Sequence, residues 1–237
     1  ENIFKKILRV RYVILTTSGT SAIYLALRAH NIGKGDEVII PNITFPATAN
    51  AVHMTGAKVV LADVSSHNLL LNVDSLHAKF TKNTRAIVPV HISGRGNNIH
   101  NLKKFADRKK VAVIEDAAEA LGSKYNNKSL GTFGDCGCFS LAPNKIITTG
   151  QGGVIVTNNK KLYEKIVQLK DQGRYRYKND ESRYMHRGFN FKFTDLQSGL
   201  GLSQIKNFKK RKEKLLNIFK FYKKNLIESK NFKIIGF

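Results

Sequence analysis

The sequence predicts an α/β fold in which a mostly parallel sheet lies between helices. Short apolar runs that suit buried strands alternate with helical patterns over residues 12–116, and this alternation is typical of a parallel sheet covered on both faces. The chain has 237 residues, of which 42% are hydrophobic and 9% aromatic, so it is long enough for one large domain with a sizeable core. Ligands of such sheets bind beyond the carboxyl ends of the strands, where functional residues are therefore expected.

The first half of the chain contributes most of this sheet. Strands are predicted where apolar runs are bounded by turn residues, and helices where apolar residues recur at helical spacing. In chain order these are a strand at 12–17, a helix opening in the Ser-Gly-Thr-Ser turn at 18–21, a strand at 37–40, a helix at 46–55, a strand at 58–64, a helix at 73–80, a strand at 85–91, a helix at 99–110 and a strand at 111–116. Repeated strand–helix units of this kind run their strands in parallel.

The second half carries two further strands around a glycine-rich turn. Residues 136–141 alternate small with bulky apolar residues, which suits a closely packed strand, and a second strand is predicted at 154–157 after a turn whose glycines let the backbone approach a ligand. The elements that follow are a helix at 162–170, an irregular surface loop at 171–187, a long helix that opens with a Thr194/Gln197 capping box, and a new strand that begins within residues 225–237.

Lys145, between these two strands, is the first candidate catalytic residue. A lysine held in a half-buried pocket loses hydration of its ammonium group, which favours the neutral amine that attacks carbonyl carbons. This is the chemistry of Schiff-base formation. Because the chain contains 40 Lys and Arg residues, a surface lysine on a loop is the competing interpretation of this segment alone.

The turn at 18–21 is a candidate anion site. It joins a strand to a helix, and the free N–H groups at a helix N-terminus attract anions such as phosphate, to which the hydroxyls of Thr20 and Ser21 can add donors. The alternative is an ordinary helix cap by Ser18 or Thr20.

Asp116 is a candidate because it ends a predicted strand, whereas Glu115 should face the opposite way. A carboxylate aimed at a pyridine nitrogen keeps that nitrogen protonated, so that the ring accepts electrons. The alternative is that Asp116 only caps a helix formed by residues 117–121.

The formal net charge of +23 by itself indicates a polyanionic partner such as nucleic acid or an acidic membrane surface. The lysines are, however, spread along the chain together with Asn and Ile. The densest run, at 206–214, is interrupted by Phe208 and continues into a largely apolar stretch at 215–219, which is typical of an amphipathic helix with a solvated basic face. We therefore expect no nucleic-acid partner and keep a non-catalytic polyanion-binding protein as a remote alternative.

Compartment and metal binding are indicated mainly by what the sequence lacks. No run approaches the length of a membrane span, and the first residues lack the apolar centre of a signal peptide, so a cytoplasmic protein without membrane insertion is expected. Cys136 and Cys138 point the same way in a predicted strand and have no His or Cys at ligand spacing nearby. We interpret them as small apolar strand residues and predict no metal site.

Five segments carry a more specific signal. They are SGTSAIYLAL at 18–27, PNITF at 41–45, IEDAAEALGS at 114–123, SLAPNKIITTGQGG at 140–153 and GFNFKFTDLQ at 188–197. In this order they resemble the DegT/DnrJ/EryC1/StrS family of aminotransferases, which depend on pyridoxal 5'-phosphate (PLP) and act on nucleotide-linked keto sugars. Each segment is weak alone, whereas the set is specific. The resemblance implies the aspartate-aminotransferase fold (fold type I), with the cofactor at the C-terminal edge of the sheet.

The resemblance also implies roles for individual residues. Lys145 would hold PLP in a Schiff base and carry a proton between the cofactor and the substrate, and Asp116 would contact the pyridine nitrogen. Glu119 would contact the ring hydroxyl, at a position where many relatives have Gln or His. Phe45 would stack on the ring, and Asn190 would reach the phosphate in the neighbouring subunit. The remaining phosphate-binding residues would be Gly19, Thr20, Ser21 and Ser140.

For the whole chain, the resemblance implies a PLP-binding large domain at 1–205 and, at 206–237, a helix leading into an incomplete C-terminal small domain. It implies a homodimer with shared sites, glutamate as amino donor and a nucleotide-linked 4-keto-6-deoxy sugar as acceptor, for surface-polysaccharide or other glycan biosynthesis. The 4-keto position is expected because EDAAEALGS with TTGQGG looks closest to perosamine-type enzymes. A 3-keto sugar and a keto-inositol are the alternative acceptors. Lys145 argues against the sugar-dehydrating branch, in which histidine replaces the lysine.

Overall fold

A seven-stranded sheet forms the centre of the fold in a computed structural model that describes residues 1–96, 99–176, 182–184, 187–226 and 235. Its strands are β1 (Tyr12–Thr16), β2 (Glu37–Pro41), β3 (Lys58–Ala62), β4 (Thr84–Ile87), β5 (Ala112–Asp116), β8 (Cys136–Ser140) and β9 (Gly153–Thr157), in the order β1-β9-β8-β5-β4-β2-β3. All neighbours from β8 to β3 are parallel, whereas β9 is antiparallel to both β8 and β1. The expectation of a mostly parallel sheet is confirmed.

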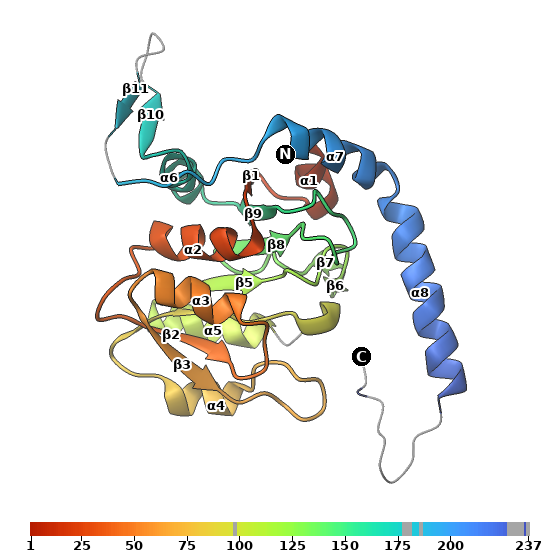
Figure 1. Ribbon diagram of the computed structural model, residues 1–237. Coiled ribbons are helices and arrows are strands. Elements are labelled where there is room, and N and C mark those ends of the chain that lie inside the picture. The colour runs from red at the N-terminus through yellow and green to blue at the C-terminus, as the bar shows by residue number, and fades with distance from the viewer. Residues whose placement is uncertain (97–98, 177–181, 185–186, 227–234, 236–237) are drawn as a thin grey trace.

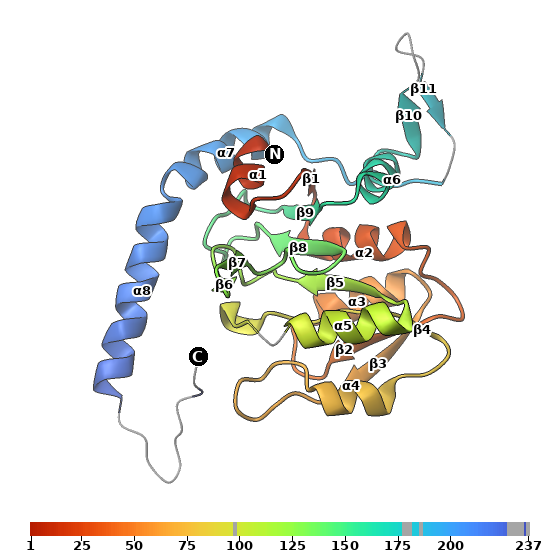
Figure 2. The same ribbon diagram turned by 180° about the vertical axis from the view of Figure 1, so that it is seen from behind.

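Helices cover both faces of the sheet. One layer consists of α2 (Gly19–Ala29), α3 (Ala47–Met54) and α6 (Lys160–Lys170), and the other of α1 (Asn2–Leu8), α4 (Val73–Lys79) and α5 (Ile99–Lys109). Figure 1 shows α2 and α3 in front of the sheet, and Figure 2 shows α5 in front after the molecule is turned. The predicted helices and strands of the first half of the chain are thus present, and no end differs from its predicted position by more than four residues.

Side chains that alternate along the strands of the sheet pack into two separate hydrophobic cores, one on each face. In β2, Val38 and Ile40 pack toward α2 and α3, whereas Ile39 packs toward α4 and α5. Every residue of β2 is buried, which is why this strand reads as a continuous apolar run. In β8, both cysteines face the first of these cores as free thiols, and burial raises the pKa of Cys136 to about 12. Both cysteines therefore behave as small apolar residues, as interpreted from the sequence.

The helix expected at 117–121 does not form. The chain makes consecutive turns there, closed by hydrogen bonds from Ala120 N to Ala117 O and from Ser123 N to Ala120 O. These turns are followed by the small hairpin of β6 (Lys124–Tyr125) and β7 (Lys128–Ser129). The strong helix-forming residues of this segment are overridden by tertiary contacts, so Asp116 cannot be explained as a helix cap.

The segment at 171–187, expected to be an irregular loop, contains a second hairpin. Its strands are β10 (Arg174–Arg176) and β11 (Ser182–Tyr184), and it projects from the body beyond α6 in Figure 1. Cross-strand partners include Arg174 with Tyr184 and Tyr175 with Arg183. Alternating aromatic and long basic side chains suit such a two-stranded pairing. The polar composition of the segment concealed this pattern.

The long helix after Thr194 is broken into α7 (Asp195–Lys206) and α8 (Phe208–Asn225) at Asn207. The predicted capping box is confirmed, because the Thr194 hydroxyl accepts from Gln197 N while the Gln197 side chain accepts from Thr194 N. Helix α8 extends along the side of the molecule in Figure 1, and none of its residues is buried. A boundary near residue 205 remains a prediction, and the strand expected at the end of the chain falls almost wholly outside the described residues.

Within the residues that the structure describes, no helix combines the length and the apolar character that a bilayer crossing requires. The same residues contain no group of three or more His, Cys, Asp or Glu side chains arranged to hold a metal ion.

Candidate active site

A cavity of about 300 Å³ lies at the carboxyl ends of the parallel strands. This volume is at the lower end of the range for small-molecule sites, roughly 300–1,000 Å³. Predicted site residues from segments far apart in the chain line it, namely Gly19, Thr20, Phe45, Asp116, Glu119, Ser140 and Lys145. Ser21 and Asn190 do not line it. The strand order of the sheet thus brings most of the predicted site together.

The turn at 18–21 is built mainly by the side chains of Ser18 and Ser21. Ser18 caps α2 by accepting from Ser21 N at 3.0 Å, and the Ser21 hydroxyl accepts from Ser18 N at 2.9 Å. The Ser21 hydroxyl also lies 3.1 Å from the hydroxyls of Thr16 and Thr17. Its hydrogen-bonding capacity is therefore used inside the turn. We accordingly place Ser21 behind the proposed anion site rather than in it.

The open N-terminus of α2 faces the end of β8 across a narrow gap. A Cβ atom built on Gly19 would lie 3.1 Å from Ser140 Cβ and 3.4 Å from Ser140 Oγ. The Ser140 hydroxyl accepts from Ala142 N at 3.2 Å, which leaves its proton free to donate to a ligand. Helix N–H groups on one side and this hydroxyl on the other form a cradle that suits a phosphate.

Gly19→Ala is expected to weaken phosphate-ester binding by roughly tenfold, because the new methyl group crowds Ser140 inside this cradle, at a cost of about 1–3 kcal/mol. The measurement is PLP affinity of the ligand-free protein by fluorescence titration. The matched control is Gly199→Ala in α7, where a Cβ meets nothing within 4 Å and Ala should stabilise the helix by up to about 1 kcal/mol. Unchanged PLP affinity in Gly19→Ala would contradict the assignment of the cradle.

Asp116 lies at the end of β5 with 5% of its surface exposed. Its carboxylate accepts from the Thr48 hydroxyl at 2.7 Å and from Ala118 N at 3.2 Å. Burial raises the pKa of Asp116, and these two hydrogen bonds oppose the rise. Among the described residues, no Lys, Arg or His side chain lies within ion-pair distance of this carboxylate. A buried carboxylate without a cationic partner favours a ligand that brings a positive charge.

Glu115 faces the opposite way, as expected, and is fully buried. Its carboxylate accepts from three backbone N–H groups of the turn that precedes β8, at 2.6–2.9 Å, and lies 2.7 Å from His91 Nε2. Because an ionised carboxylate only accepts hydrogen bonds, the proton of this contact belongs to His91. Nδ1 of His91 is then turned away from Glu115.

His91 lines the cavity, and its Nδ1 is buried without a hydrogen-bond partner among the residues that the structure describes. Buried polar atoms are almost always hydrogen-bonded in native proteins. An orphaned ring nitrogen beside a cavity therefore indicates that a bound molecule or water satisfies it there. This observation supports a ligand at the same place as the Asp116 carboxylate.

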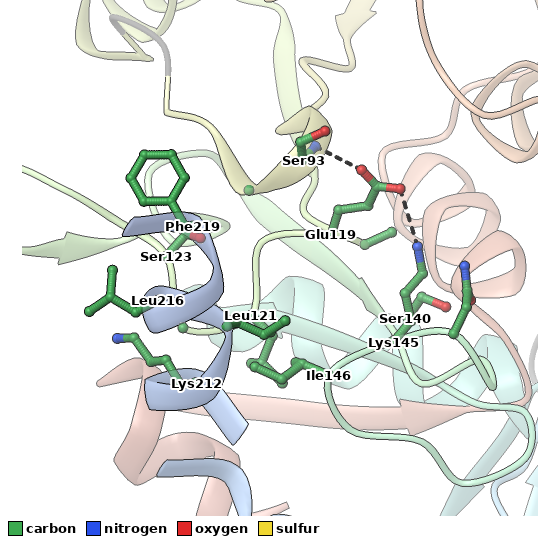
Figure 3. A pocket seen from close by; sticks show the side chains of 15 residues that line it. Ser93, Glu119, Leu121, Ser123, Ser140, Lys145, Ile146, Lys212, Leu216 and Phe219 are labelled. Carbon is green, nitrogen blue, oxygen red and sulfur yellow. Dashed lines mark hydrogen bonds and ion pairs between the residues drawn. The ribbon is translucent and has the colours of Figure 1, made fainter. Parts of the chain in front are cut away.

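Lys145 lies on the turn after β8 and contacts Glu119. Its Nζ is 3.5 Å from Glu119 Oε1, and Glu119 Oε2 accepts from Ser93 N at 2.7 Å. Figure 3 shows Glu119 between Ser93 and Lys145, with Ser140 beside the lysine. Only 17% of the Lys145 side chain is exposed. The amine is thus held at the cavity by one carboxylate, in the half-buried position that the sequence indicated.

A second, larger cavity of about 580 Å³ adjoins the first and shares Glu119, Ser140 and Lys145 with it. Its opposite wall comes from α8, and Figure 3 shows Lys212, Leu216 and Phe219 on that side. Helix α8 is fixed here by Arg211, whose Nη1 donates to Ile146 O at 3.1 Å. Lys145 therefore has access to two connected spaces, a small one at the strand ends and a larger one under α8.

Phe45 lines the small cavity with 76% of its surface exposed. An aromatic ring this exposed contributes little to the core, and large exposed apolar groups often mark a binding or interface position. It follows Thr44 directly and precedes α3, so its backbone is fixed while its ring is not. This arrangement suits a ring that stacks on a flat ligand.

Asn190 does not line the cavity of its own chain. It forms an isolated antiparallel bridge with Asp171 and is exposed. The neighbouring residue Phe191 is tied to β1, because its carbonyl accepts from the Thr16 hydroxyl at 3.0 Å. Lys192 Nζ pairs with Asp171 at 2.9 Å. The segment is therefore held rigidly, with Asn190 free to contact another molecule.

The residues of the site that escaped the sequence analysis include Thr48, His91 and Ser93. Thr48 was read as an ordinary helix residue and His91 as the last residue of a strand. The only sequence signal was that His91 ends an apolar run that leads to the same sheet edge as Asp116. Ser93 contributes its backbone N–H, which leaves no signal in side-chain identity. Its left-handed φ of 52° belongs to the short 3-10 turn at Ile92–Gly94.

The residues present fit PLP. The amine of Lys145, the Asp116 carboxylate without a cation, the orphaned His91 Nδ1 and the cradle between Gly19 and Ser140 all border one cavity. The amine, the carboxylate and the cradle suit three groups of the cofactor, namely its aldehyde carbon, its pyridine nitrogen and its phosphate.

Comparisons with known proteins agree with this fit. The DegT/DnrJ/EryC1/StrS aminotransferase family matches residues 1–237. A GDP-perosamine synthase from Escherichia coli O157:H7 is 38% identical over 231 residues, covering 95% of this chain and 62% of that protein. A UDP-N-acetyl-3-dehydro-alpha-D-glucosamine 3-aminotransferase from Acidithiobacillus ferrooxidans is 41% identical over 172 residues, covering 72% and 47%.

A solved structure gives the same result for the fold. PseC of Helicobacter pylori, an aminotransferase involved in the biosynthesis of pseudoaminic acid, matches with a TM-score of 0.84 and 31% identity, over 95% of this chain and 62% of that one. The predicted fold type I architecture is confirmed by this likeness and by the observed sheet. The chain spans less than two thirds of the length of each of these relatives.

Proposed function

This chain belongs to the DegT/DnrJ/EryC1/StrS aminotransferase family, and from that premise we propose that it forms the cofactor-binding part of a PLP-dependent sugar aminotransferase. The proposed reaction moves an amino group from glutamate to a nucleotide-linked keto sugar. The observation that carries the proposal is that Lys145, Asp116 and the N-terminus of α2 meet at one cavity. A reactive amine, a carboxylate and an anion cradle in one place are the groups that this cofactor requires.

In this reaction, each residue of the site would have a separate role. Lys145 would hold the cofactor through its Nζ and would carry a proton to and from the substrate carbon. Asp116 would contact the pyridine nitrogen and keep it protonated. When bound, PLP supplies the electron sink that stabilises negative charge on that carbon. Glu119, 3.5 Å from Lys145 Nζ, would hold the amine at the edge of the cavity.

Binding and orientation fall to the remaining site residues. Gly19 and Thr20 would present backbone N–H groups to the phosphate, and Ser140 would donate its hydroxyl. Phe45 would cover one face of the ring. A second copy of this chain would contribute Asn190 to the phosphate, which makes a homodimer part of the proposal. Its support is that Asn190 is exposed on a rigid segment and does not line the cavity of its own chain.

The acceptor is proposed to be a nucleotide-linked 4-keto-6-deoxy sugar. Support comes from the extent of the matches, because the GDP-perosamine synthase covers 95% of the chain and the 3-aminotransferase 72%. The sugar would approach Lys145 through the larger cavity under α8, which shares Lys145 and Glu119 with the cofactor cavity. A 3-keto sugar is the second candidate, favoured by the 41% identity to the 3-aminotransferase.

The proposal is tested by mixing the purified protein with PLP and then with glutamate. We expect a visible absorption band of the lysine-linked cofactor, its loss on addition of glutamate, and release of one 2-oxoglutarate for each cofactor converted. Nucleotide-linked 4-keto and 3-keto sugars are then supplied in separate reactions, with a keto-inositol as the third acceptor. Turnover of only the 3-keto sugar would overturn the 4-keto assignment. A folded protein that binds no PLP would overturn the proposed function of this chain.

A further inference from the structure

We propose that Thr48, supported by Thr44, is a positioning residue that fixes the Asp116 carboxylate in the orientation and charge state that the ring nitrogen needs. Neither threonine was a candidate from the sequence. The inference rests on the proposed function in one respect only, namely that the ligand facing Asp116 is a pyridine ring. The hydroxyl chain itself is a feature of the protein without any ligand.

Three oxygen atoms form the chain. The Thr44 and Thr48 hydroxyls lie 2.8 Å apart, and the Thr48 hydroxyl donates to Asp116 Oδ2 at 2.7 Å. Thr48 is fully buried, and Asp116 is 5% exposed. Because 68 residues separate Thr48 from Asp116, the contact joins α3 to the end of β5. Such charge-assisted hydrogen bonds are among the strong ones in proteins.

The proton positions follow from the chemistry of the groups. An ionised carboxylate only accepts, so Thr48 must use its single proton on Asp116. Thr48 can then only accept from Thr44, which directs both protons toward the carboxylate. If Asp116 became protonated and donated to Thr48, then Thr48 would have to donate to Thr44, and both hydrogen bonds would reverse their direction. The arrangement therefore favours the ionised carboxylate over the neutral acid.

The other groups around Asp116 contribute less than Thr48 to keeping its carboxylate ionised. Ala118 N donates to Oδ1 at the longer distance of 3.2 Å. His91 and Lys145 also lower the pKa of Asp116 electrostatically, but their effects rank below the hydrogen bonds. His91 Nε2 is already engaged by Glu115, and Lys145 Nζ by Glu119. Burial outweighs all of them and raises the pKa, so loss of the Thr48 donor would raise it further.

The same segment also places the stacking residue. Thr44 and Thr48 are four positions apart around the start of α3, and Thr48 N donates to Phe45 O at 3.2 Å. The backbone of Phe45 and the oxygen that holds Asp116 are therefore fixed by one short turn. Thr48 thus couples the residue proposed to cover the ring face to the residue proposed to hold the ring nitrogen.

The experiment compares Thr48→Val, Thr48→Ser and Thr55→Val with the parent chain. Valine keeps the shape of threonine but removes the hydroxyl, and serine restores it. Thr55 is the matched control, because it is buried at the other end of α3 and its hydroxyl donates to Val52 O at 2.7 Å. Carbon-13 NMR of labelled aspartate follows the Asp116 titration in ligand-free protein, with Asp116→Asn identifying the signal.

We expect the titration midpoint of Asp116 to move to higher pH in Thr48→Val, to return toward the parent in Thr48→Ser and to stay unchanged in Thr55→Val. With PLP bound, the pH dependence of its absorption should shift in Thr48→Val, and kcat should fall roughly tenfold with KM for glutamate within about twofold. Thr44→Val, which leaves the inner donor in place, should give a smaller shift in the same direction and serves if Thr48→Val does not fold.

An Asp116 midpoint that is the same in Thr48→Val and the parent would overturn the inference. So would a shift of equal size in Thr55→Val, because the effect would then reflect general loosening of α3. The ligand-free titration is independent of the proposed function. If the midpoint shifts as expected but no variant binds PLP, the positioning role stands and the proposed function fails.

Discussion

Lys145→Ala is expected to lower the rate of amino transfer at least about a thousandfold and to abolish the absorption band of the lysine-linked cofactor. A positioned proton-transferring group alone contributes roughly 10²–10⁴-fold, and the covalent link to the cofactor is lost in addition. The measurements are the visible spectrum with PLP and single-turnover formation of 2-oxoglutarate from glutamate.

Lys170→Ala is the control for this experiment. Burial lowers the pKa of Lys170, so its amine is also predisposed to react with aldehydes, but its Nζ donates to Leu15 O and does not line the cavity. We expect Lys170→Ala to lose stability and to keep both the band and the transfer. A parent-like band in Lys145→Ala, lost instead in Lys170→Ala, would show that the reactive lysine was assigned wrongly.

Asp116→Asn is expected to separate stability from function. Burial holds the pKa of Asp116 above its ordinary value in the folded protein. Between the unfolded and the folded pKa the native state binds more protons, so stability falls as pH rises through that window and the full penalty applies above it. Asparagine keeps the shape without the charge. The ligand-free variant should therefore be at least as stable as the parent at neutral pH, as measured by denaturant unfolding at several pH values.

The same variant should lose catalysis by roughly 10²-fold or more, because an amide cannot keep the ring nitrogen protonated. Added PLP should also raise the unfolding midpoint of the parent more than that of Asp116→Asn. A stability that falls at neutral pH, together with undiminished transfer, would contradict the role given to Asp116.

Glu115→Gln, one residue earlier, is the opposite case. The Glu115 carboxylate accepts from three backbone N–H groups and from His91 in a fully buried position. Its replacement by glutamine is expected to cost stability, by about 3–5 kcal/mol if the whole arrangement is disrupted. Replacement of the two adjacent acidic residues by their amides is thus expected to change stability in opposite directions. The hydrogen bonds of Glu115 are all made within the protein, whereas Asp116 has no cationic partner until a ligand binds.

The sequence by itself determined the strands of the main sheet and the helices between them, and it named candidates for the reactive residues. Apolar periodicity and turn residues located the strands of the sheet, because both are local signals. The periodicity depends only on the direction in which successive side chains leave the backbone. For the same reason the opposite orientations of Glu115 and Asp116 followed from their adjacency in one strand. The capping box of Thr194 and Gln197 was equally readable, since both partners lie within one turn.

Only the tertiary structure decided which of these residues meet. The Thr48 hydroxyl reaches Asp116 across 68 residues, and Gly19 approaches Ser140 because α2 lies over the end of β8. Such contacts depend on the order of strands in the sheet, which no local pattern encodes. The turns at 117–123 and the hairpin of β10 and β11 differ from their sequence predictions for the same reason, since packing and cross-strand pairing outweigh intrinsic propensities of less than about 1 kcal/mol per residue.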